Sequence, residues 1–278
     1  MNDGAVIDVL VPRPLTRSQG EARVSVRLRD GGSVLSQVRQ AGSFKMLFPR
    51  GEGPALEAVL LNTSGGMTGG DRFRALANVD AGAALTLSTQ AAERAYRARP
   101  KERATLSVGL TLAPGARIDW LPQETILYDG AALDRRLRID LAPGATALVV
   151  EPLIIGRTAM GEVVRDAHLT DRWEVWQDGA LIFADALRLT GDPSALMDRA
   201  GAGGGARAMA ALLYLGRDAG ARRAALADAL GATGGASLVQ DGVLFGRVLA
   251  SDGFFLRKRL IPAIATLRDG PLPKVWRL

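Results

Sequence analysis

Short runs in which apolar residues alternate with polar ones, or follow one another, dominate the chain from about Ala22 to Leu189. Examples are VSVRL at Val24, LTLST at Leu85, ATLSVGLTL at Ala104, LRIDL at Leu137 and ALVV at Ala147. Runs of this length at short, regular spacing predict β-strands, and they favour a sandwich, a barrel or stacked coils over βαβ units. The pattern therefore predicts a mainly β fold and leaves its topology open.

Part of this pattern repeats, as VDAGAALTL at Val79, LAPGARIDW at Leu112 and LAPGATALV at Leu141. Each copy reads as a strand, a small turn with a glycine, and another strand; the turn glycines are Gly82, Gly115 and Gly144. The apolar run after each turn ends at polar residues, which are Thr89 and Gln90, Gln123 and Glu124, and Glu151. If the turns stack, these polar ends form a column through or beside the sheets. If the turns are ordinary hairpins, Pro-Gly and Ala-Gly are only turn formers.

The pattern of residues changes after Gly191 from strand-like runs to helix signals. Asp192, Pro193 and Ser194 resemble the start of a helix, and we expect helices over about 206–215 and about 218–230, the second ended by Gly231. A hairpin across Asp241-Gly242 follows. Because strand-like sequence resumes there, we predict a single domain over residues 1–278 with a helical insertion at about 192–231.

The segment NTSGGMTGGD, from Asn62 to Asp71, lies between two strand-like runs, 56–61 and 73–79. It is not a phosphate loop, since no Lys follows the last glycine and the glycines fall in adjacent pairs instead of the GxGxxG spacing. One interpretation is a plain glycine-rich connection. The other is a rigid turn that presents Asp71, with Thr63, Ser64 and Thr68 nearby.

Length and composition describe an ordinary globular protein, with 278 residues, 47% hydrophobic and 23% charged. No run approaches the ~20 apolar residues that cross a bilayer, so no membrane partner is expected. The first fourteen residues lack the basic and apolar regions of a secretory signal. We expect a cytoplasmic protein.

The chain has no Cys and one His, His168, so disulfides, thiolate metal sites and a tight His/Cys cage are excluded. A metal could be held only weakly, by oxygen ligands. The carboxylates beside turns are the candidates for chemistry, although such groups are also common as solvated or helix-capping residues: Asp71, Glu93, Glu124, Glu151 and Glu162. Ser/His/Asp catalysis could use only His168, and no GxSxG motif accompanies it, which makes a hydrolase improbable.

The formal net charge is +6, and four of the 35 basic residues are lysines. An arginine-dominated surface suits an acidic protein partner or nucleic acid, although coding bias also produces it. The basic segment 92–103, with Arg94, Arg97, Arg99 and Arg103, and LRKRL at Leu256 define the alternative function of a binding module. Nucleic acid is not the expected partner, because no RNP aromatic pair, zinc finger or basic zipper helix is present.

Several segments together resemble the urease accessory proteins of the UreD type, also called UreH. They are NTSGGMTGGDRF, TQAAERAYRA at Thr89, WLPQETILYDGAAL at Trp120, GRTAMGE, DRWEVWQDGALIFAD and the ending KVWRL. The resemblance covers nearly the whole chain, with the motifs in order from Gly42 to the C-terminus. It implies stacked sheets in a helical, sandwich-like arrangement with two α-helices in the C-terminal third.

The resemblance also implies a non-enzymatic maturation factor. Such a factor acts with a helical accessory protein (UreF) and a GTPase (UreG), in paired copies within a larger complex, to insert Ni²⁺ into the urease apoprotein. Asp71 and Glu162 match acidic residues thought to line a transient nickel route, here with Glu124, Glu151, Thr63 and Ser64. No tightly bound cofactor is expected, because an ion that must move on suits weak oxygen sites.

Overall fold

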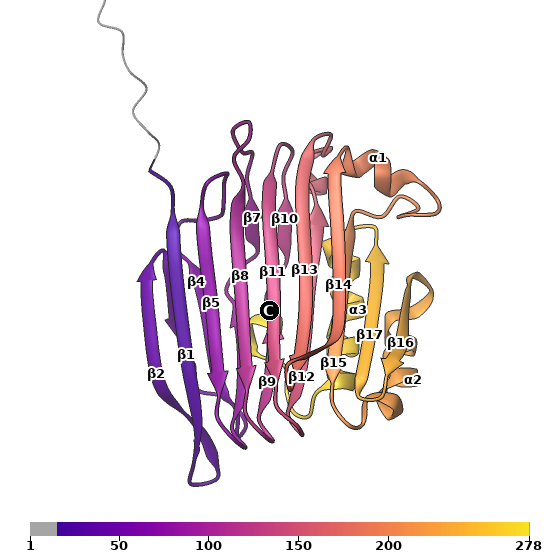
Figure 1. Cartoon of the computed structure of the whole chain (residues 1–278). Coiled ribbons are helices and arrows are strands. Elements are labelled where there is room, and N and C mark those ends of the chain that lie inside the picture. The colour runs from indigo at the N-terminus through magenta and orange to yellow at the C-terminus, as the bar shows by residue number, and fades with distance from the viewer. Residues whose placement is uncertain (1–15, 278) are drawn as a thin grey trace, which may run out of the picture.

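The computed structural model describes residues 16–277, which form two facing β-sheets with helices at one side (Figure 1). The seven-stranded sheet has the order β14-β13-β11-β8-β5-β1-β2. Its strands are β1 (Gln19–Arg29), β2 (Gly32–Gly42), β5 (Arg72–Val79), β8 (Ala104–Leu112), β11 (Ala132–Leu141), β13 (Ala167–Gln177) and β14 (Ala180–Gly191).

The ten-stranded sheet has the order β16-β17-β15-β12-β9-β6-β4-β3, and two short strands, β7 and β10, extend it beside β12. Its strands are β3 (Phe44–Leu47), β4 (Leu56–Asn62), β6 (Ala84–Thr89), β7 (Glu93–Ala95), β9 (Arg117–Leu121), β10 (Thr125–Leu127), β12 (Thr146–Ile155), β15 (Ala208–Leu215), β16 (Gly234–Gln240) and β17 (Val243–Ala250). The prediction of a mainly β fold with stacked sheets is confirmed.

From β4 to β13 the chain winds between the two sheets, so each coil places one long strand in each. The strands β5, β8, β11 and β13 are therefore parallel neighbours, as are β4, β6, β9 and β12. The repeated glycine turns are the crossings from the seven-stranded to the ten-stranded sheet. They stack: Gly82 N–H donates to the Pro114 carbonyl (3.2 Å), and all three turn glycines have φ of 69–77°. The stacking interpretation of the repeat is confirmed.

Alternation along the strands builds the core between the sheets. On β5 the residues Ala75, Ala77 and Val79 face inward, and they belong to the same buried cluster as Leu85 and Ile118 of the opposite sheet. Small inward residues allow the sheets to pack closely, while the intervening polar positions of β5 face solvent. The result is an apolar layer between the two sheets.

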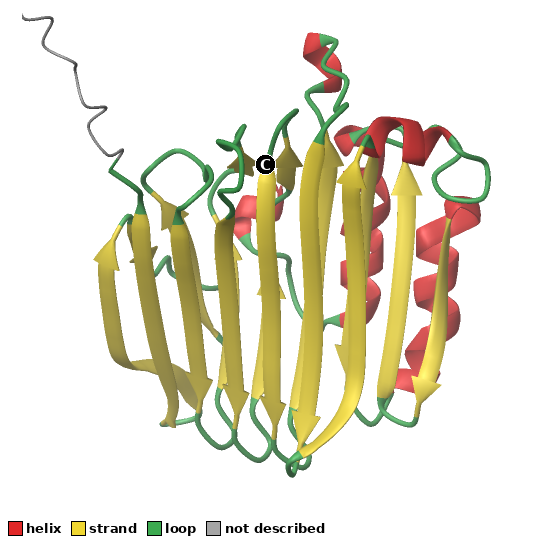
Figure 2. Ribbon diagram, turned by 45° about the horizontal axis from the view of Figure 1, so that its top comes forward, coloured by secondary structure: helices red, strands yellow, loops and turns green. Residues whose placement is uncertain are grey.

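The helices are α1 (Pro193–Asp198), α2 (Ala219–Leu230), α3 (Gly253–Leu267) and α4 (Lys274–Arg277), with short 3₁₀ turns η1 (Thr158–Met160) and η2 (Gly231–Thr233). Figure 2 shows the two longer helices, α2 and α3, beside the far face of the ten-stranded sheet. There Leu226, Leu256 and Leu260 join a second buried cluster with Leu148 and Leu212 of the sheet. The ten-stranded sheet is thus buried on both faces near β12 and β15.

The helix expected at about 206–215 is wrong, because this segment forms strand β15 between β12 and β17. Seven of its eight residues are buried, as expected for a strand covered on both faces. An apolar run of this length has no periodicity that separates a strand from a buried helix, and its Ala, Leu and Met content favoured the helix. The segment 192–231 is therefore not a purely helical insertion.

The second long helix is α3, which the sequence reasoning treated only as a basic cluster. Pro262 lies inside it, a residue usually taken to break helices. Its start carries a clear signal, since the Asp252 side chain accepts a hydrogen bond from Phe255 N–H (3.0 Å). The predictions of α2, of Asp192 as a helix cap and of the Asp241-Gly242 hairpin are confirmed.

The expectation about a secretory signal falls on residues outside the described part of the chain. Within residues 16–277, none of the helices combines the length and the hydropathy needed to span a bilayer.

Candidate functional site

Four loops that return the chain from the ten-stranded to the seven-stranded sheet stack at one end of the coils. They are the glycine turn 63–71, the segment 90–103 with β7, the segment 122–131 with β10, and the loop 156–166. Backbone contacts join each to the next: Tyr96 N–H donates to the Met67 carbonyl (2.8 Å), Tyr128 N–H to Ala95 (3.0 Å) and Gly156 N–H to Leu127 (2.8 Å). The glycine turn, the AAER segment, the QETILYDG segment and the GRTAMGE segment therefore form one continuous surface.

Asn62 organises the entry to the glycine turn. Its side-chain oxygen accepts hydrogen bonds from Ser64 N–H (3.0 Å) and Ser64 Oγ (2.6 Å). Its amide nitrogen donates to the Gly66 carbonyl (3.2 Å) and to both carboxylate oxygens of Glu93 (3.1 and 3.2 Å). Gly66 is required here, since a Cβ would lie 2.3 Å from the Tyr96 ring. The turn is thus a rigid, specifically bonded structure.

Asp71 is buried at the end of this turn, with 4% of its surface exposed. Its two carboxylate oxygens accept hydrogen bonds from Ser18 N–H and Thr68 N–H, each 2.8 Å. Its own carbonyl accepts from Thr105 N–H (2.9 Å), which ties the turn to β8. In this structure Asp71 is therefore shielded from solvent and fixes the backbone of the turn.

Glu162 lies on the last of the four loops, where Arg157 holds it. Its carboxylate accepts two hydrogen bonds from the Arg157 side chain (2.9 and 3.1 Å) and one from Arg157 N–H (2.9 Å). These bonds lower the pKa of Glu162. The Arg157 guanidinium also stacks on Tyr128 (4.4 Å), whose ring packs edge-on against Tyr96. The aromatic pair connects Glu162 with the glycine turn, because Tyr96 Oη donates to the Gly65 carbonyl (3.1 Å).

A cavity of about 120 Å³ leads from this surface into the space between the sheets. Its outer lining includes Gly65 and the exposed Gln90, and its inner lining includes the buried Gln123 and Glu151. Most polar groups in the lining offer oxygen atoms: Asn62, Thr89, Gln90, Glu93, Gln123, Thr125 and Glu151. Four of the five polar residues that follow the turns of the repeat, Thr89, Gln90, Gln123 and Glu151, therefore meet in one space. Neither Asp71 nor Glu162 is among the residues that line it.

An ion-paired trio closes the inner end of this cavity. The buried Arg135 donates to Asp171 Oδ2 (2.6 Å) and to Thr125 Oγ1 (3.2 Å). Its Nη2 also lies 2.9 Å from Glu151 Oε2, without the alignment of a hydrogen bond, while Glu151 Oε1 accepts from Trp120 Nε1 (2.8 Å). Burial raises the pKa of Glu151 to about 7, and this outweighs the attraction of Arg135. Two carboxylates thus share one guanidinium out of contact with water.

Glu93 is the carboxylate nearest the mouth. Burial raises its pKa to about 7, although the hydrogen bonds from Asn62 act in the opposite direction. Near neutral pH the group can therefore exchange a proton for a cation. The sequence marked Glu93 as a carboxylate beside a turn, and its burial is what the sequence could not show.

The remaining predicted residues lie elsewhere. Glu124 points toward α3, where it pairs with Arg257 (3.4 Å), and that arginine also donates to Gln123 Oε1 (2.9 Å). Thr63 is exposed and donates to the Ser43 carbonyl (2.9 Å). His168 Nε2 lies 3.4 Å from Asp134 Oδ1, and both residues belong to the seven-stranded sheet. The structure thus gathers the side chains of Glu151 and Glu93 in one cavity. Glu93 N–H donates to the Glu124 carbonyl (2.8 Å), but the Glu124 side chain is directed away from the cavity, and His168 lies outside its lining.

The arginines of the basic segment 92–103 are partly committed to ion pairs. Arg97 pairs with Asp129 and Arg103 with Asp134 (3.5 Å). Asp129 in turn accepts from Arg165 N–H and Asp166 N–H (2.9 and 3.0 Å), so the arginine braces the loop 156–166. This part of the alternative binding surface therefore has a structural role.

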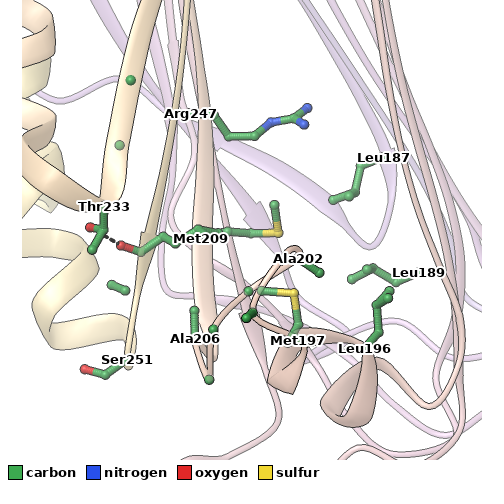
Figure 3. Close-up of a pocket in the computed structure, with 18 of the residues that line it drawn as sticks. Leu187, Leu189, Leu196, Met197, Ala202, Ala206, Met209, Thr233, Arg247 and Ser251 are labelled. Atoms are coloured by element: carbon green, nitrogen blue, oxygen red, sulfur yellow. Dashed lines mark hydrogen bonds between the residues drawn. The ribbon is translucent and has the colours of Figure 1, made fainter.

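A larger cavity, of about 800 Å³, opens between β14 and the strands β15 and β17. Figure 3 shows the side chains of Leu189, Leu196, Met197 and Met209 directed toward it, with Arg247 at one side. Its described lining contains no carboxylate and no histidine, so it offers apolar contacts and no oxygen-rich path for a cation. Over residues 16–277, the structure also brings no three His, Cys, Asp or Glu side chains into a group that could hold a metal ion.

Comparison with known proteins identifies the family of the chain. The family model described as UreD urease accessory protein matches residues 18–277. The chain belongs to the UreD family of urease accessory proteins. The urease accessory protein UreD of Ruegeria pomeroyi is 49% identical over 246 residues, which covers 88% of this chain and 96% of that relative. The UreD of Roseobacter denitrificans is 45% identical over 267 residues, covering 96% and 97%. The UreD of Azorhizobium caulinodans is 43% identical, covering 94% and 97%.

The resemblance found in the sequence is therefore confirmed, and with it a role in urease maturation. All four motif segments that carried the resemblance before residue 163 belong to the stacked loops. The matched relatives are named as accessory proteins.

Proposed function

We propose that this UreD protein is the scaffold and the nickel route of a urease maturation complex. It acts in the cytoplasm, in paired copies, with a UreF-type helical protein and a UreG-type GTPase. Nickel is its cargo, passed on to the urease apoprotein and not retained as a cofactor. The protein itself carries out no catalysis, since the chain has no phosphate loop and any GTP hydrolysis belongs to the partner.

The observation that carries this proposal is the cavity beneath the glycine turn, in which oxygen-bearing side chains line the space together with apolar residues and with Arg94 and Arg135. A volume of about 120 Å³ holds several water molecules, since one water needs roughly 10–15 Å³ of such space, so a partly hydrated ion fits. Its ligands are amide, hydroxyl and carboxylate oxygens, which bind Ni²⁺ more weakly than imidazole or thiolate would. Weak ligands at successive depths let an ion enter and leave.

Each acidic residue has a distinct part in this proposal. Glu93 accepts the ion at the mouth, and Glu151 attracts it inward while Arg135 and Asp171 keep the inner end close to neutral. Asp71 holds the turn that shapes the mouth. Glu162 lies on the neighbouring loop with its charge paired to Arg157, and Thr63 and Ser64 lie on the exposed part of the glycine turn, outside the cavity lining. Glu124 continues the path on the α3 side of Gln123.

The test is nickel insertion into urease apoprotein by the purified accessory proteins, with nickel per active site as the readout. A Glu93→Gln, Glu151→Gln double variant should lower nickel incorporation severalfold, because neutral amides keep the shape of the cavity and lose its attraction for a cation. Glu162→Ala tests the outer loop in the same assay. Asp178→Asn is the matched control, since Asp178 is an exposed turn residue.

Co-purification with the partners separates the two parts of the proposal. The double variant should bind the accessory proteins and urease as the wild type does, because the cavity lies inside the coils. Urease that acquires normal nickel with the double variant would overturn the route. Failure of the wild-type protein to associate with urease would overturn the scaffold.

A further inference from the structure

The outer face of the seven-stranded sheet carries an excess of arginine that the fold does not need. The parallel register places Arg74 of β5, Ser107 of β8, Arg136 of β11 and Arg172 of β13 in one row across the sheet. Arg136 and Arg172 are direct neighbours, about 4.8 Å apart in backbone position. On the next row Arg23 of β1 lies opposite Arg39 of β2.

Like charges placed directly across two strands destabilise a sheet. Elsewhere the protein compensates its arginines: Arg138, one row away, makes two hydrogen bonds to Asp140 (2.9 and 2.7 Å). Within residues 16–277, Arg23, Arg74, Arg136 and Arg172 have no carboxylate within ion-pairing distance. All four are exposed, so their guanidinium groups are available to an outside partner.

The strand between these arginines is built to let a partner approach closely. The outward side chains of β8 are small: Thr105, Ser107, Gly109 and Thr111. Leu76 of β5 covers Gly109, so the open stretch is the one around Thr105 and Ser107. Two shallow hollows of about 540 and 360 Å³ lie along it, and both are lined by Arg74 and Ser107. Arg23 and Arg138 border the second hollow. Together they form a trough, here called the β8 trough, with arginines on both sides.

We propose that the β8 trough binds an acidic segment of a partner protein, whose Asp and Glu side chains pair with Arg74, Arg136 and Arg172. Guanidinium groups match carboxylates in bidentate geometry, and the small β8 residues leave room for the segment between the arginine rows. The like-charge repulsion present in the free protein is relieved on binding. The positive net charge of the chain then assists the encounter with an acidic partner.

The same face argues for a protein and against nucleic acid. Four carboxylates are interspersed among the arginines, namely Glu21, Asp134, Asp140 and Glu174. A phosphodiester backbone presents negative charge continuously and would meet these carboxylates, whereas a protein surface can avoid them by its own pattern of charge. Trp176, an aromatic residue of this face, is covered by the Arg138 guanidinium at 5.0 Å and is not free to stack on a base.

The inference does not depend on the nickel route, because the trough lies on the solvent face of the sheet opposite to the cavity. The β8 trough would bind one partner of a maturation complex, a protein with a segment rich in Asp and Glu.

Binding to poly-L-glutamate and to duplex DNA of equal total charge, measured by fluorescence anisotropy at ~0.15 M salt, tests the proposal. The variant is Arg74→Glu with Arg136→Glu in the full chain. The matched control is Arg50→Glu with Arg217→Glu, which changes the net charge equally at exposed sites outside the rows. Thermal unfolding of both variants checks the fold.

We expect the trough variant to bind poly-L-glutamate about tenfold or more weakly, and the control to change affinity much less. The melting temperature of the trough variant should change little, because Arg136→Glu replaces a like-charge pair with an opposite-charge pair while Arg74→Glu places a second carboxylate opposite Glu21. Equal losses in the two variants would show attraction by net charge alone and overturn the inference. Tighter binding of DNA than of poly-L-glutamate, lost in the trough variant, would overturn it in favour of nucleic acid.

Discussion

Replacing Glu93 by Gln measures how much the buried carboxylate of this residue destabilises the folded protein. Glu93 lies beneath the glycine turn, where Asn62 donates to both of its oxygens and burial raises its pKa from 4.5 to about 7. In the unfolded chain the same group ionises near its ordinary pKa. The folded protein therefore binds the proton more tightly, and the unfolding free energy falls as pH rises from about 4.5 to about 7.

The magnitude follows from the two pKa values. At about 1.4 kcal/mol for each pH unit between them, the ionised carboxylate costs the folded state up to roughly 3 kcal/mol above pH 7. A glutamine in the same place is neutral at every pH and keeps an oxygen that can accept from Asn62. Glu93→Gln should therefore raise the unfolding free energy by about 2–3 kcal/mol near pH 8 and by less than about 1 kcal/mol near pH 5.

Urea unfolding of wild type and variant at both pH values measures the difference. Glu151, the other carboxyl group whose pKa burial raises, is present in both proteins, so its contribution to the difference in unfolding free energy cancels. Asp178→Asn at an exposed turn is the control. A difference for Glu93→Gln that is the same at both pH values would show that Glu93 ionises normally, and it would refute the assignment of a buried, cation-accepting carboxylate.

Three further predictions concern the framework around the cavity. Arg135→Met should destabilise the protein by about 3–5 kcal/mol in urea unfolding at neutral pH, because two buried carboxylates lose their counter-ion; a loss under about 1 kcal/mol would contradict this. Gly70→Ala should cost about 1–3 kcal/mol, since φ is +88° and the new methyl meets Arg17 at 2.9 Å, whereas Gly53→Ala, in open space, should be nearly neutral. Asp71→Asn should cost about 1–3 kcal/mol in thermal unfolding, because an amide nitrogen cannot accept from a backbone N–H; an unchanged melting temperature would argue against its bracing role.

Much of the fold could be predicted from local patterns in the sequence. The strands 56–61 and 73–79 and the three stacked turns all follow from alternation and turn chemistry, which depend on neighbouring residues only. The helix α2 with its terminal Gly231 was predictable for the same reason. The family could also be identified, because its motifs occur in order along the chain.

The sequence by itself thus determined the β class, the repeat of strand, glycine turn and strand, the absence of tight metal ligands and the membership of the UreD family. That the repeat forms stacked coils and not hairpins was decided by the structure. Only the tertiary structure decided that 208–215 is a strand, because its two neighbours bury both of its faces. It also decided that Glu93 and Glu151 share a cavity while Asp71 braces a turn and Glu124 faces α3. Burial and pairing between residues tens of positions apart set these roles, and no local pattern records them.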